Sequence, residues 1–365
     1  MKKVLSSILA LGLMVSSIAG CGSTSTSKTD TGKASSKNLI GVAMPTQSLQ
    51  RWNQDGANMK SQLEAKGYKV ELQYANNDVN TQTQQLENMI TKGAKVLVVA
   101  SIDGSALTDV LKKAADNKVK VIAYDRLIMN TDNVNYYATF DNFKVGVTQG
   151  KYIEDKLGLK DGKGPFNIEL FGGSPDDNNA NFFFGGAMSI LQPYIDNGKL
   201  VVKSGQKEFT KIAIQGWESA KAQARMDNLI TANYASGTKL DVVLSPNDSL
   251  AIGIIASLKN NGYGTADKAY PIITGQDCDK PNVLAMINNQ QSMSIFKDTR
   301  TLAAKVVEMV DAVLQGKEAP VNDTKTYNNG KKVVPSFLCD PVYADKDNYK
   351  KILIDSGYYK EADLK

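Results

Sequence analysis

Short apolar segments alternate with amphipathic segments along the chain from residue 39 onwards. Most apolar segments are continuous, without a polar residue at every second position, which indicates strands buried on both faces of a sheet. We predict such strands at 39–44, 96–100, 119–124, 136–140, 166–171, 200–203, 241–244 and 272–275, and one alternating strand at 69–74. Buried strands that alternate with helices predict parallel sheets covered by helices on both faces.

The predicted helices follow these strands at 55–66, 80–93, about 107–114, 180–194, 217–234 and 250–260. Gly67 suits the position after the first helix, and Asn80 suits the N-cap of the second. There are too many strands for one small sheet, and the series restarts near residue 166 with a second set of similar length. We therefore predict an α/β protein with two doubly wound parallel-sheet domains.

The last part of the chain adds a strand at 292–297, a helix at 298–314, a strand at 333–339 and a helix at 349–356. These late elements are best explained if the chain crosses back between the domains, which produces a three-strand hinge. The predicted N-terminal domain is 38–142 plus about 298–337, and the predicted C-terminal domain is 143–297 plus about 338–365.

Residues 1–20 have the features of a signal peptide. Lys2 and Lys3 precede an apolar stretch that is too short for an ordinary membrane-spanning helix, and small residues precede Cys21. This pattern is typical of a bacterial lipoprotein, with cleavage before Cys21 and a lipid on its thiol; a plain secretory signal is the alternative. Residues 21–37 are polar and are expected to form a flexible tether. We expect attachment to the extracytoplasmic face of the cell membrane through the lipid alone.

The composition excludes several kinds of chemistry. The 365 residues contain no histidine, which removes histidine-based catalytic triads and HExxH zinc sites. Three cysteines are too few for a disulfide framework, and Cys278 and Cys339 are expected to be isolated, with a disulfide between them as the alternative. The 43 Lys and Arg against 38 Asp and Glu give a mild net charge of +5, well mixed along the chain. We expect no metal, no cofactor and no nucleic acid.

Polar and aromatic side chains follow the predicted strands where each strand ends. In open parallel sheets, ligands bind outside the carboxyl ends of the strands. Carboxylates accept hydrogen bonds from hydroxyl groups, and Arg and Asn side chains donate them, so such a set fits a neutral polyol. Asp and Asn are also common helix caps, but Arg and Lys are not, which favours binding. The candidates are Arg51, Trp52, Asp125, Arg126, Asp141, Asn142, Asn178, Asn179, Trp217, Asn247, Asp248, Asp277 and Lys297.

Five segments resemble the xylose-binding and multiple-sugar-binding branch of the type I periplasmic binding proteins. They are VIAYDRL (121–127), YYATFDNFKVG (136–146), ELFGGSPDDNNA (169–180), SPNDSLA (245–251) and TGQDCD (274–279). The resemblance extends from about Leu39 to the C-terminus. It implies two similar α/β domains, a monosaccharide buried between them, and delivery of that sugar to the permease of an ABC transporter.

The resemblance also implies a role for each candidate residue. Arg51 and Trp52 belong to the sugar-contacting loop after the first strand, and Asp125 and Arg126 are paired ligand residues. Asp141 and Asn142 lie at the first crossover, and Asn178 and Asn179 line the second domain. Trp217 stacks on the sugar ring, and Lys297 lies where the chain returns through the hinge. Further hydrogen-bonding groups are Asn247, Asp248 and Asp277.

One position departs from the family pattern. Ribose- and xylose-type relatives carry an arginine about where Phe184 stands, within the run 182–184 of three phenylalanines. The change weakens the case for one particular pentose and fits a larger ring or a short oligosaccharide; packing of these rings in the core is the alternative.

The predicted function is capture of a monosaccharide of the xylose, glucose, galactose or arabinose type by a monomeric, lipid-anchored protein. The alternatives are binding of short oligosaccharides, or sugar sensing by docking on a sensor kinase or chemoreceptor. Asp125 and Asp248 could form the carboxylate pair of a glycosidase. Nothing in the sequence indicates a raised pKa for either, so no enzymatic activity is expected.

Overall fold

Two groups of strands form the framework of the computed structural model, which describes residues 38–364. All of these residues belong to one compact unit. The predicted signal peptide, Cys21 and the tether lie outside the described residues. No helix in the described part of the chain is both long and apolar enough to cross a membrane.

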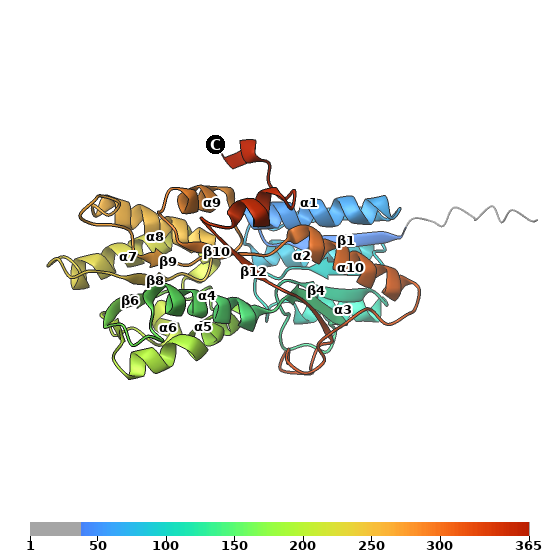
Figure 1. Ribbon diagram of the computed structural model, residues 1–365. Helices are drawn as coiled ribbons and strands as arrows, with labels where there is room; N and C mark the ends of the chain where they lie inside the picture. The colour runs from blue at the N-terminus through green and yellow to red at the C-terminus, as the bar shows by residue number, and fades with distance from the viewer. Residues whose placement is uncertain (1–37, 365) are drawn as a thin grey trace, which may run out of the picture. The chain divides into compact units, whose positions relative to one another are not determined.

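The N-terminal lobe is built on a six-stranded parallel sheet with the order β11-β5-β4-β3-β1-β2 (Figure 1). Its strands are β1 (Leu39–Met44), β2 (Lys69–Tyr74), β3 (Val96–Val99), β4 (Lys120–Tyr124), β5 (Tyr136–Phe140) and β11 (Ser336–Cys339). Helices α1 (Gln50–Ala65) and α10 (Thr299–Leu314) cover one face, and α2 (Val79–Thr91) and α3 (Thr108–Asp116) cover the other. Because side chains alternate along a strand, Val42 of β1 packs under α1 and α10 while Ala43 packs on the opposite face.

The C-terminal lobe is built on a four-stranded parallel sheet with the order β7-β6-β8-β9. Its strands are β6 (Phe166–Leu170), β7 (Leu200–Val202), β8 (Val242–Leu244) and β9 (Ile272–Ile273). Helices α4 (Asn142–Leu157) and α5 (Asn179–Asp196) pack on one side, and α7 (Ser219–Asn233) and α8 (Asp248–Asn260) on the other. A parallel bridge from Gln276 to Ile295 connects this lobe to β10 (Met293–Phe296), which pairs antiparallel with β12 (Val342–Asp345).

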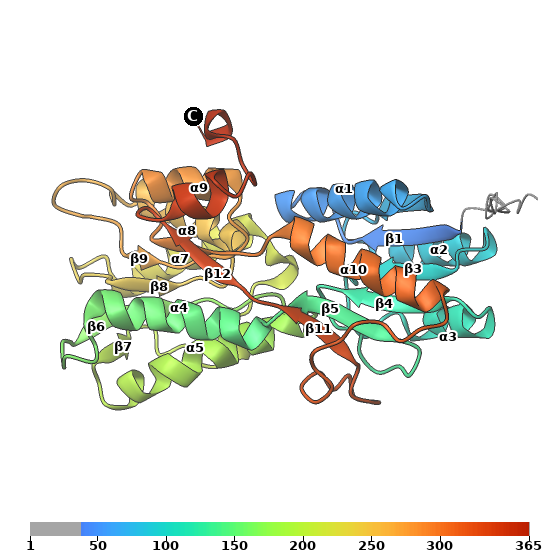
Figure 2. The ribbon, with the colours of Figure 1, turned by 45° about the vertical axis from the view of Figure 1, so that its right-hand side comes forward.

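The chain passes between the lobes at three places (Figure 2). It leaves the first sheet after β5, returns from β10 into α10, and passes over again between β11 and β12. The remaining short elements are α6 (Phe209–Ile212), η1 (Gln215–Trp217), α9 (Lys280–Ile287), the π-helical turn η2 (Lys350–Ile354) and η3 (Glu361–Leu364). The prediction of an α/β protein with parallel sheets in two lobes is confirmed.

Local details differ from the sequence-based expectations. Asp78, rather than Asn80, caps α2, because its carboxylate accepts a hydrogen bond from the backbone N–H of Thr81. The helix predicted from Trp217 begins two residues later at Ser219, because Trp217 has a left-handed φ of 56° that a continuing helix cannot contain. The helix predicted at 349–356 is a single π-helical turn.

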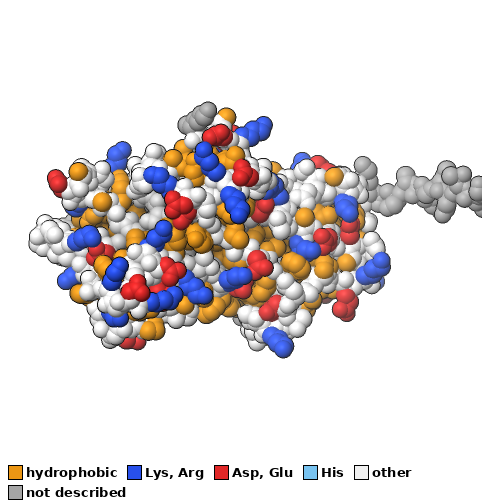
Figure 3. Space-filling view, in the orientation of Figure 1, with side chains coloured by type: hydrophobic (Ala, Val, Ile, Leu, Met, Phe, Trp, Pro, Cys, Tyr) orange, Lys and Arg blue, Asp and Glu red, His pale blue; other side chains and the backbone are white. Residues whose placement is uncertain are grey.

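Acidic and basic side chains are interspersed over the face seen in Figure 3, which agrees with the mild net charge. No large single-sign region is visible on this face.

Candidate functional site

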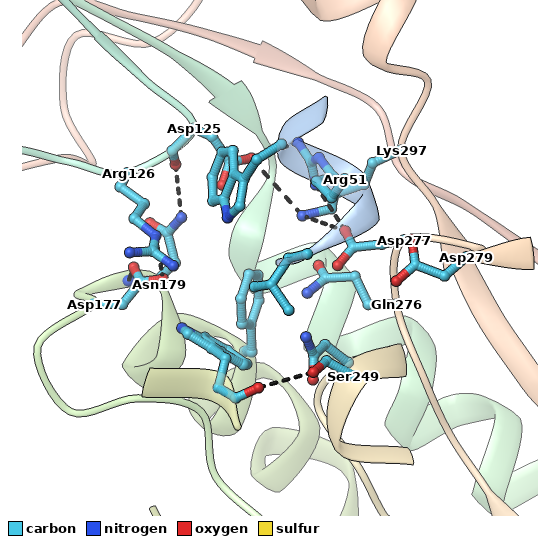
Figure 4. Close-up of a pocket in the computed structure, with 15 residues that line it drawn as sticks. Arg51, Asp125, Arg126, Asp177, Asn179, Ser249, Gln276, Asp277, Asp279 and Lys297 are labelled. Atoms are coloured by element: carbon cyan, nitrogen blue, oxygen red, sulfur yellow. Dashed lines mark hydrogen bonds and ion pairs between the residues drawn. The ribbon is translucent and has the colours of Figure 1, made fainter. Parts of the chain in front are cut away.

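A pocket lies where residues from both lobes meet at the carboxyl ends of the strands (Figure 4). Each sheet contributes the loops that follow its strands, as expected for open parallel sheets. The lining residues are Leu49, Arg51, Trp52, Asp125 and Arg126 from the N-terminal lobe, Asp177, Asn179, Phe183, Trp217, Asn247, Ser249, Gln276, Asp277 and Asp279 from the C-terminal lobe, and Lys297 between β10 and α10.

Arg51 is the central cation of the pocket. It lies in the first turn of α1, is only 5% exposed, and its guanidinium contacts three carboxylates. Nε lies 2.8 Å from Asp55, Nη2 lies 2.7 Å from Asp125, and Nη1 lies 2.7 Å from Asp277 in the other lobe. The planar fork of arginine suits this arrangement, because it presents several donors in fixed directions. Arg51 therefore connects the two lobes through the pocket.

Two of the carboxylates around Arg51 differ in pKa. Burial raises the pKa of Asp55 to about 6, although Arg51 opposes the rise. Burial also acts to raise the pKa of Asp125, but Arg51, Lys297 and Arg126 outweigh it and hold that pKa below its ordinary value. Asp125 is therefore a charged acceptor at neutral pH, and Asp55 serves behind the pocket as a partner of Arg51.

The backbone of Asp125 is held in an unusual conformation, with a φ of 58°. Its carbonyl oxygen accepts hydrogen bonds from Tyr137 Oη at 2.5 Å, Thr139 Oγ1 at 3.0 Å and Asn179 Nδ2 at 2.6 Å. The last of these bonds joins the two lobes. These three bonds stabilise a left-handed turn that directs the Asp125 side chain to Arg51.

Arg126 forms the second cationic centre. Its Nε lies 3.0 Å from Asp177, and Nη1 donates to the carbonyl oxygens of Ser101 and Ile102 at 3.0 and 3.2 Å. The guanidinium also lies 5.1 Å from the centroid of the Trp52 ring, a cation–π distance. Arg126 is therefore rigidly positioned before any ligand binds.

Aromatic side chains form the apolar walls. The indole of Trp217 rests directly on Gly173, where a Cβ atom would come within 2.0 Å of the ring, so this position has to be glycine. Phe183 packs edge-on against Trp217 at 6.3 Å between centroids. Phe182 packs on Tyr327, and Phe184 packs on Phe209. Of the three consecutive phenylalanines, only Phe183 lines the pocket.

Most of the candidate residues named from the sequence lie in the pocket lining. Those that do are Arg51, Trp52, Asp125, Arg126, Asn179, Trp217, Asn247, Asp277 and Lys297. Lys297 is 3% exposed, and its Nζ lies 3.1 Å from Asp277 and 3.8 Å from Asp125.

Four candidates lie outside the lining. Asp141 caps α4 by accepting from the backbone N–H of Lys144, and the Nδ2 of Asn142 donates to Tyr137 Oη. Asn178 precedes α5 without lining the pocket, since its neighbour Asn179 occupies that side. Asp141 thus shows why helix starts resemble ligand sites in composition, since its carboxylate makes a local capping hydrogen bond.

Asp248 is the fourth of these candidates. Its fully buried carboxylate accepts hydrogen bonds from Gln291 Nε2, Ser294 Oγ and the backbone N–H of Asp279, each at 2.9 Å. Burial, followed by the neighbouring Asp279, raises its pKa well above the ordinary value. A raised pKa is one mark of a catalytic acid, but this carboxyl group is enclosed by protein donors. Asp248 therefore stabilises the loop that carries Asp277 and Asp279.

The structure adds lining residues that the sequence did not single out as ligands. Asp177 is adjacent to the predicted Asn178, and Gln276 and Asp279 flank the predicted Asp277 within one strand-end segment. The polar composition of these segments marked the loops as candidates, but it could not show in which direction each side chain points. Leu49, Phe183 and Ser249 gave no chemical signal of this kind.

Residues 38–364 form neither a metal site nor a disulfide. Within residues 38–364, no group of three or more Asp, Glu, Cys or His side chains is placed to hold a metal ion. Cys278 and Cys339 are both buried and free. Burial raises the pKa of both thiols, which keeps them protonated at neutral pH.

Comparisons with known proteins agree with this architecture. Residues 40–318 match the model of a periplasmic binding protein domain. A multiple sugar-binding periplasmic protein of Azospirillum brasilense is 60% identical over 332 residues, covering 91% of this chain and 92% of that protein. The D-xylose-binding periplasmic protein of Escherichia coli (strain K12) is 38% identical over 325 residues, covering 89% of this chain and 92% of that protein.

A solved structure shares the fold as well as much of the sequence. It is an ABC transporter solute binding protein from Clostridium phytofermentans with bound β-D-glucose. The TM-score is 0.87 and the sequence identity 60%, with coverage of 90% of this chain and 100% of that chain.

Proposed function

The chain belongs to the periplasmic binding protein family, as its motifs predict, and we propose that it captures a monosaccharide in the pocket between its lobes. The observation that carries this proposal is a set of buried polar atoms in the lining that lack hydrogen-bond partners. They are one donor, Trp217 Nε1, and two acceptors, Gln276 Oε1 and Asp279 Oδ1. Buried polar groups are normally paired, so such atoms call for a ligand.

A sugar ring has the chemistry to satisfy this set. Each hydroxyl group donates one hydrogen bond and accepts others, so one ligand can serve both donors and acceptors. The carboxylates of Asp125 and Asp277 are held in place by Arg51 and Lys297 and can accept further bonds from hydroxyl groups. The aromatic rings of the lining can cover the apolar faces of the sugar.

Glucose and related monosaccharides are the first ligands to test, because the solute binding protein from Clostridium phytofermentans, which is 60% identical to this chain, was solved with bound β-D-glucose. We propose delivery to the permease of an ABC transporter, since that relative is described as a solute binding protein of such a transporter. Binding requires no covalent step, and the lining carboxylates of Asp125, Asp177 and Asp277 are each paired with a cation. The protein acts as a monomeric carrier in this proposal.

The proposed mechanism is closure of the two lobes over the sugar. Bonds such as Arg51 to Asp277 and Asn179 to Asp125 join the lobes directly at the pocket. A sugar that contacts both lobes binds this arrangement better than an open one, and it must therefore shift the population towards closure. The crossings between the lobes provide the hinge.

Titration calorimetry tests the function, with D-glucose, D-xylose, D-galactose, L-arabinose and cellobiose as ligands. We expect at least one monosaccharide to bind, to decrease the radius of gyration in solution scattering, and to raise the melting temperature. At a hundredfold excess over Kd, ligand binding stabilises the folded state by about 2.7 kcal/mol. If none of the monosaccharides binds, the proposed function is wrong. If a sugar binds but the scattering curve is unchanged, only the closure mechanism fails.

We also propose that Cys21 carries a lipid anchor, on the basis of the signal-like pattern that precedes it. Replacing Cys21 by serine should release the protein from the membrane fraction and abolish incorporation of labelled palmitate. The Cys339→Ser variant is the matched control, because it removes a buried thiol and leaves Cys21 in place. Palmitate labelling of the Cys21→Ser protein would contradict the proposal.

A further inference from the structure

The ionisable side chains that line the pocket do not balance in charge. Four carboxylates face three cations, which leaves one excess negative charge when all are ionised. The carboxylates are Asp125, Asp177, Asp277 and Asp279, and the cations are Arg51, Arg126 and Lys297. A net charge in a buried pocket is costly unless a ligand or a proton compensates it.

The excess charge can be assigned to one residue. Asp125 and Asp277 each lie 2.7 Å from Arg51, and Asp177 lies 3.0 Å from Arg126. Asp279 forms no ion pair with any residue between 38 and 364. It is therefore the lining carboxyl group that no cation among residues 38–364 contacts directly, although Arg51 and Lys297 act on it from further away.

Asp279 is also incompletely hydrogen-bonded. It occupies the N-cap position of α9, but its side chain makes no capping hydrogen bond. Its Oδ1 atom is buried and has no partner. Figure 4 shows the carboxyl group directed towards Asp277 and Gln276, inside the pocket. Burial, and then Asp277, raises its pKa to about 7.

Gln276 supplies a second, independent acceptor at the same end of the pocket. It is 2% exposed, and its Nε2 lies 3.4 Å from the carbonyl oxygen of Pro246. This contact orients the amide so that Oε1 is left buried without a donor. Gln276, Asp277 and Asp279 together form what we call the acceptor end of the pocket. Two of its oxygen atoms lack donors, and its Asp279 carboxyl group forms no ion pair within the described chain.

We propose that the acceptor end binds an ammonium group, and that the ligands of this protein therefore include amino sugars. This inference rests on the proposed function, since the rest of the sugar occupies the same pocket. A hydroxyl group has one proton to donate and no charge, whereas an ammonium group has three protons and a positive charge. An amino sugar thus supplies the donors that Gln276 and Asp279 lack and also balances the excess charge.

Proton release provides a signature of this arrangement. A bound cation favours the ionised form of Asp279, so binding at pH 6.5 should expel part of the proton that this group holds in the free protein. The titratable and charged groups that surround Asp279 are Asp277 and Cys278 on its own loop, Asp248 at the start of α8, Arg51 on α1, Lys297 after β10 and Tyr359 near the C-terminus.

Titration calorimetry with D-glucose and its 2-amino-2-deoxy, 3-amino-3-deoxy and 6-amino-6-deoxy derivatives tests the proposal. We expect at least one amino sugar to bind as tightly as glucose or more tightly. In the Asp279→Asn variant, the affinity of that amino sugar relative to glucose should fall at least tenfold. The Asp267→Asn variant removes one exposed carboxylate on the surface and should leave the ratio unchanged.

A second measurement on the unmodified protein remains decisive if the Asp279→Asn variant does not fold. At pH 6.5, the binding heat measured in buffers of different ionisation enthalpy should show more proton release with the amino sugar than with glucose. Equal release overturns the proposal, as does an unchanged affinity ratio in the variant. If glucose binds and every amino sugar binds more than a hundredfold more weakly, the inference is wrong while the proposed function stands. If no monosaccharide binds, both are wrong.

Discussion

Replacing Arg51 by alanine is expected to lower the free energy of unfolding by about 3–5 kcal/mol and to abolish sugar binding. The guanidinium compensates Asp55, Asp125 and Asp277, all three within 2.8 Å. Without it, these carboxylates are left close together, with Lys297 and the more distant Arg126 as the remaining cations of the pocket. Removing one partner of a buried ion pair costs more than the pair itself contributes, because the other charge remains buried and unpaired.

Urea denaturation of the Arg51→Ala protein measures this effect. The Arg51→Lys variant keeps the charge but loses the fork that reaches three carboxylates, so it should recover only part of the stability. Arg300→Ala is the matched control, since Arg300 pairs with Asp298 in a partly exposed position and is expected to cost about 1 kcal/mol or less. An Arg51→Ala protein as stable as the Arg300→Ala control would show that Arg51 does not organise the pocket.

Replacing Asp125 by asparagine is expected to weaken sugar binding by about 2–5 kcal/mol, the cost of losing one partner of a buried, charged contact. Asparagine tolerates the left-handed φ of 58° at this position better than alanine does. The change therefore removes the charge and leaves the turn intact. The three hydrogen bonds to the carbonyl oxygen of residue 125 do not involve its side chain and should persist.

Calorimetric titration with the tightest-binding monosaccharide measures this loss. Asn178→Ala is a suitable control, because Asn178 lies next to two lining residues without lining the pocket itself. The sugar affinity of the Asn178→Ala protein should stay within about threefold of that of the unmodified protein. If the Asp125→Asn protein binds sugar as tightly as the original, Asp125 is not part of the binding site. The Asp125→Ala variant should have a lower free energy of unfolding than the Asp125→Asn variant, because alanine tolerates the left-handed backbone of this turn less well than asparagine does.

The general position of the site was predictable because parallel sheets bring the carboxyl ends of their strands to one edge. Arg51, Asp125, Asn247 and Asp277 all follow predicted strands closely, and all of them line the pocket. The alternation of apolar segments and helices in the sequence was enough to predict that these strand ends lie together. This prediction did not require the exact bounds of each strand or helix. Lys297 was predictable for the same reason, since it directly follows β10.

The sequence by itself thus determined the α/β architecture with two lobes, the edge at which the pocket lies, and the polar residue types that line it. Only the tertiary structure decided which of several adjacent polar residues faces the pocket. Asn179 rather than Asn178 lines it, and Asp279 rather than Asp248. The direction of a loop side chain depends on backbone angles such as the φ of 98° at Asp277, and on donors that arrive from distant positions. Gln291 and Ser294 enclose the Asp248 carboxylate, and neither contact is encoded in the local sequence around it.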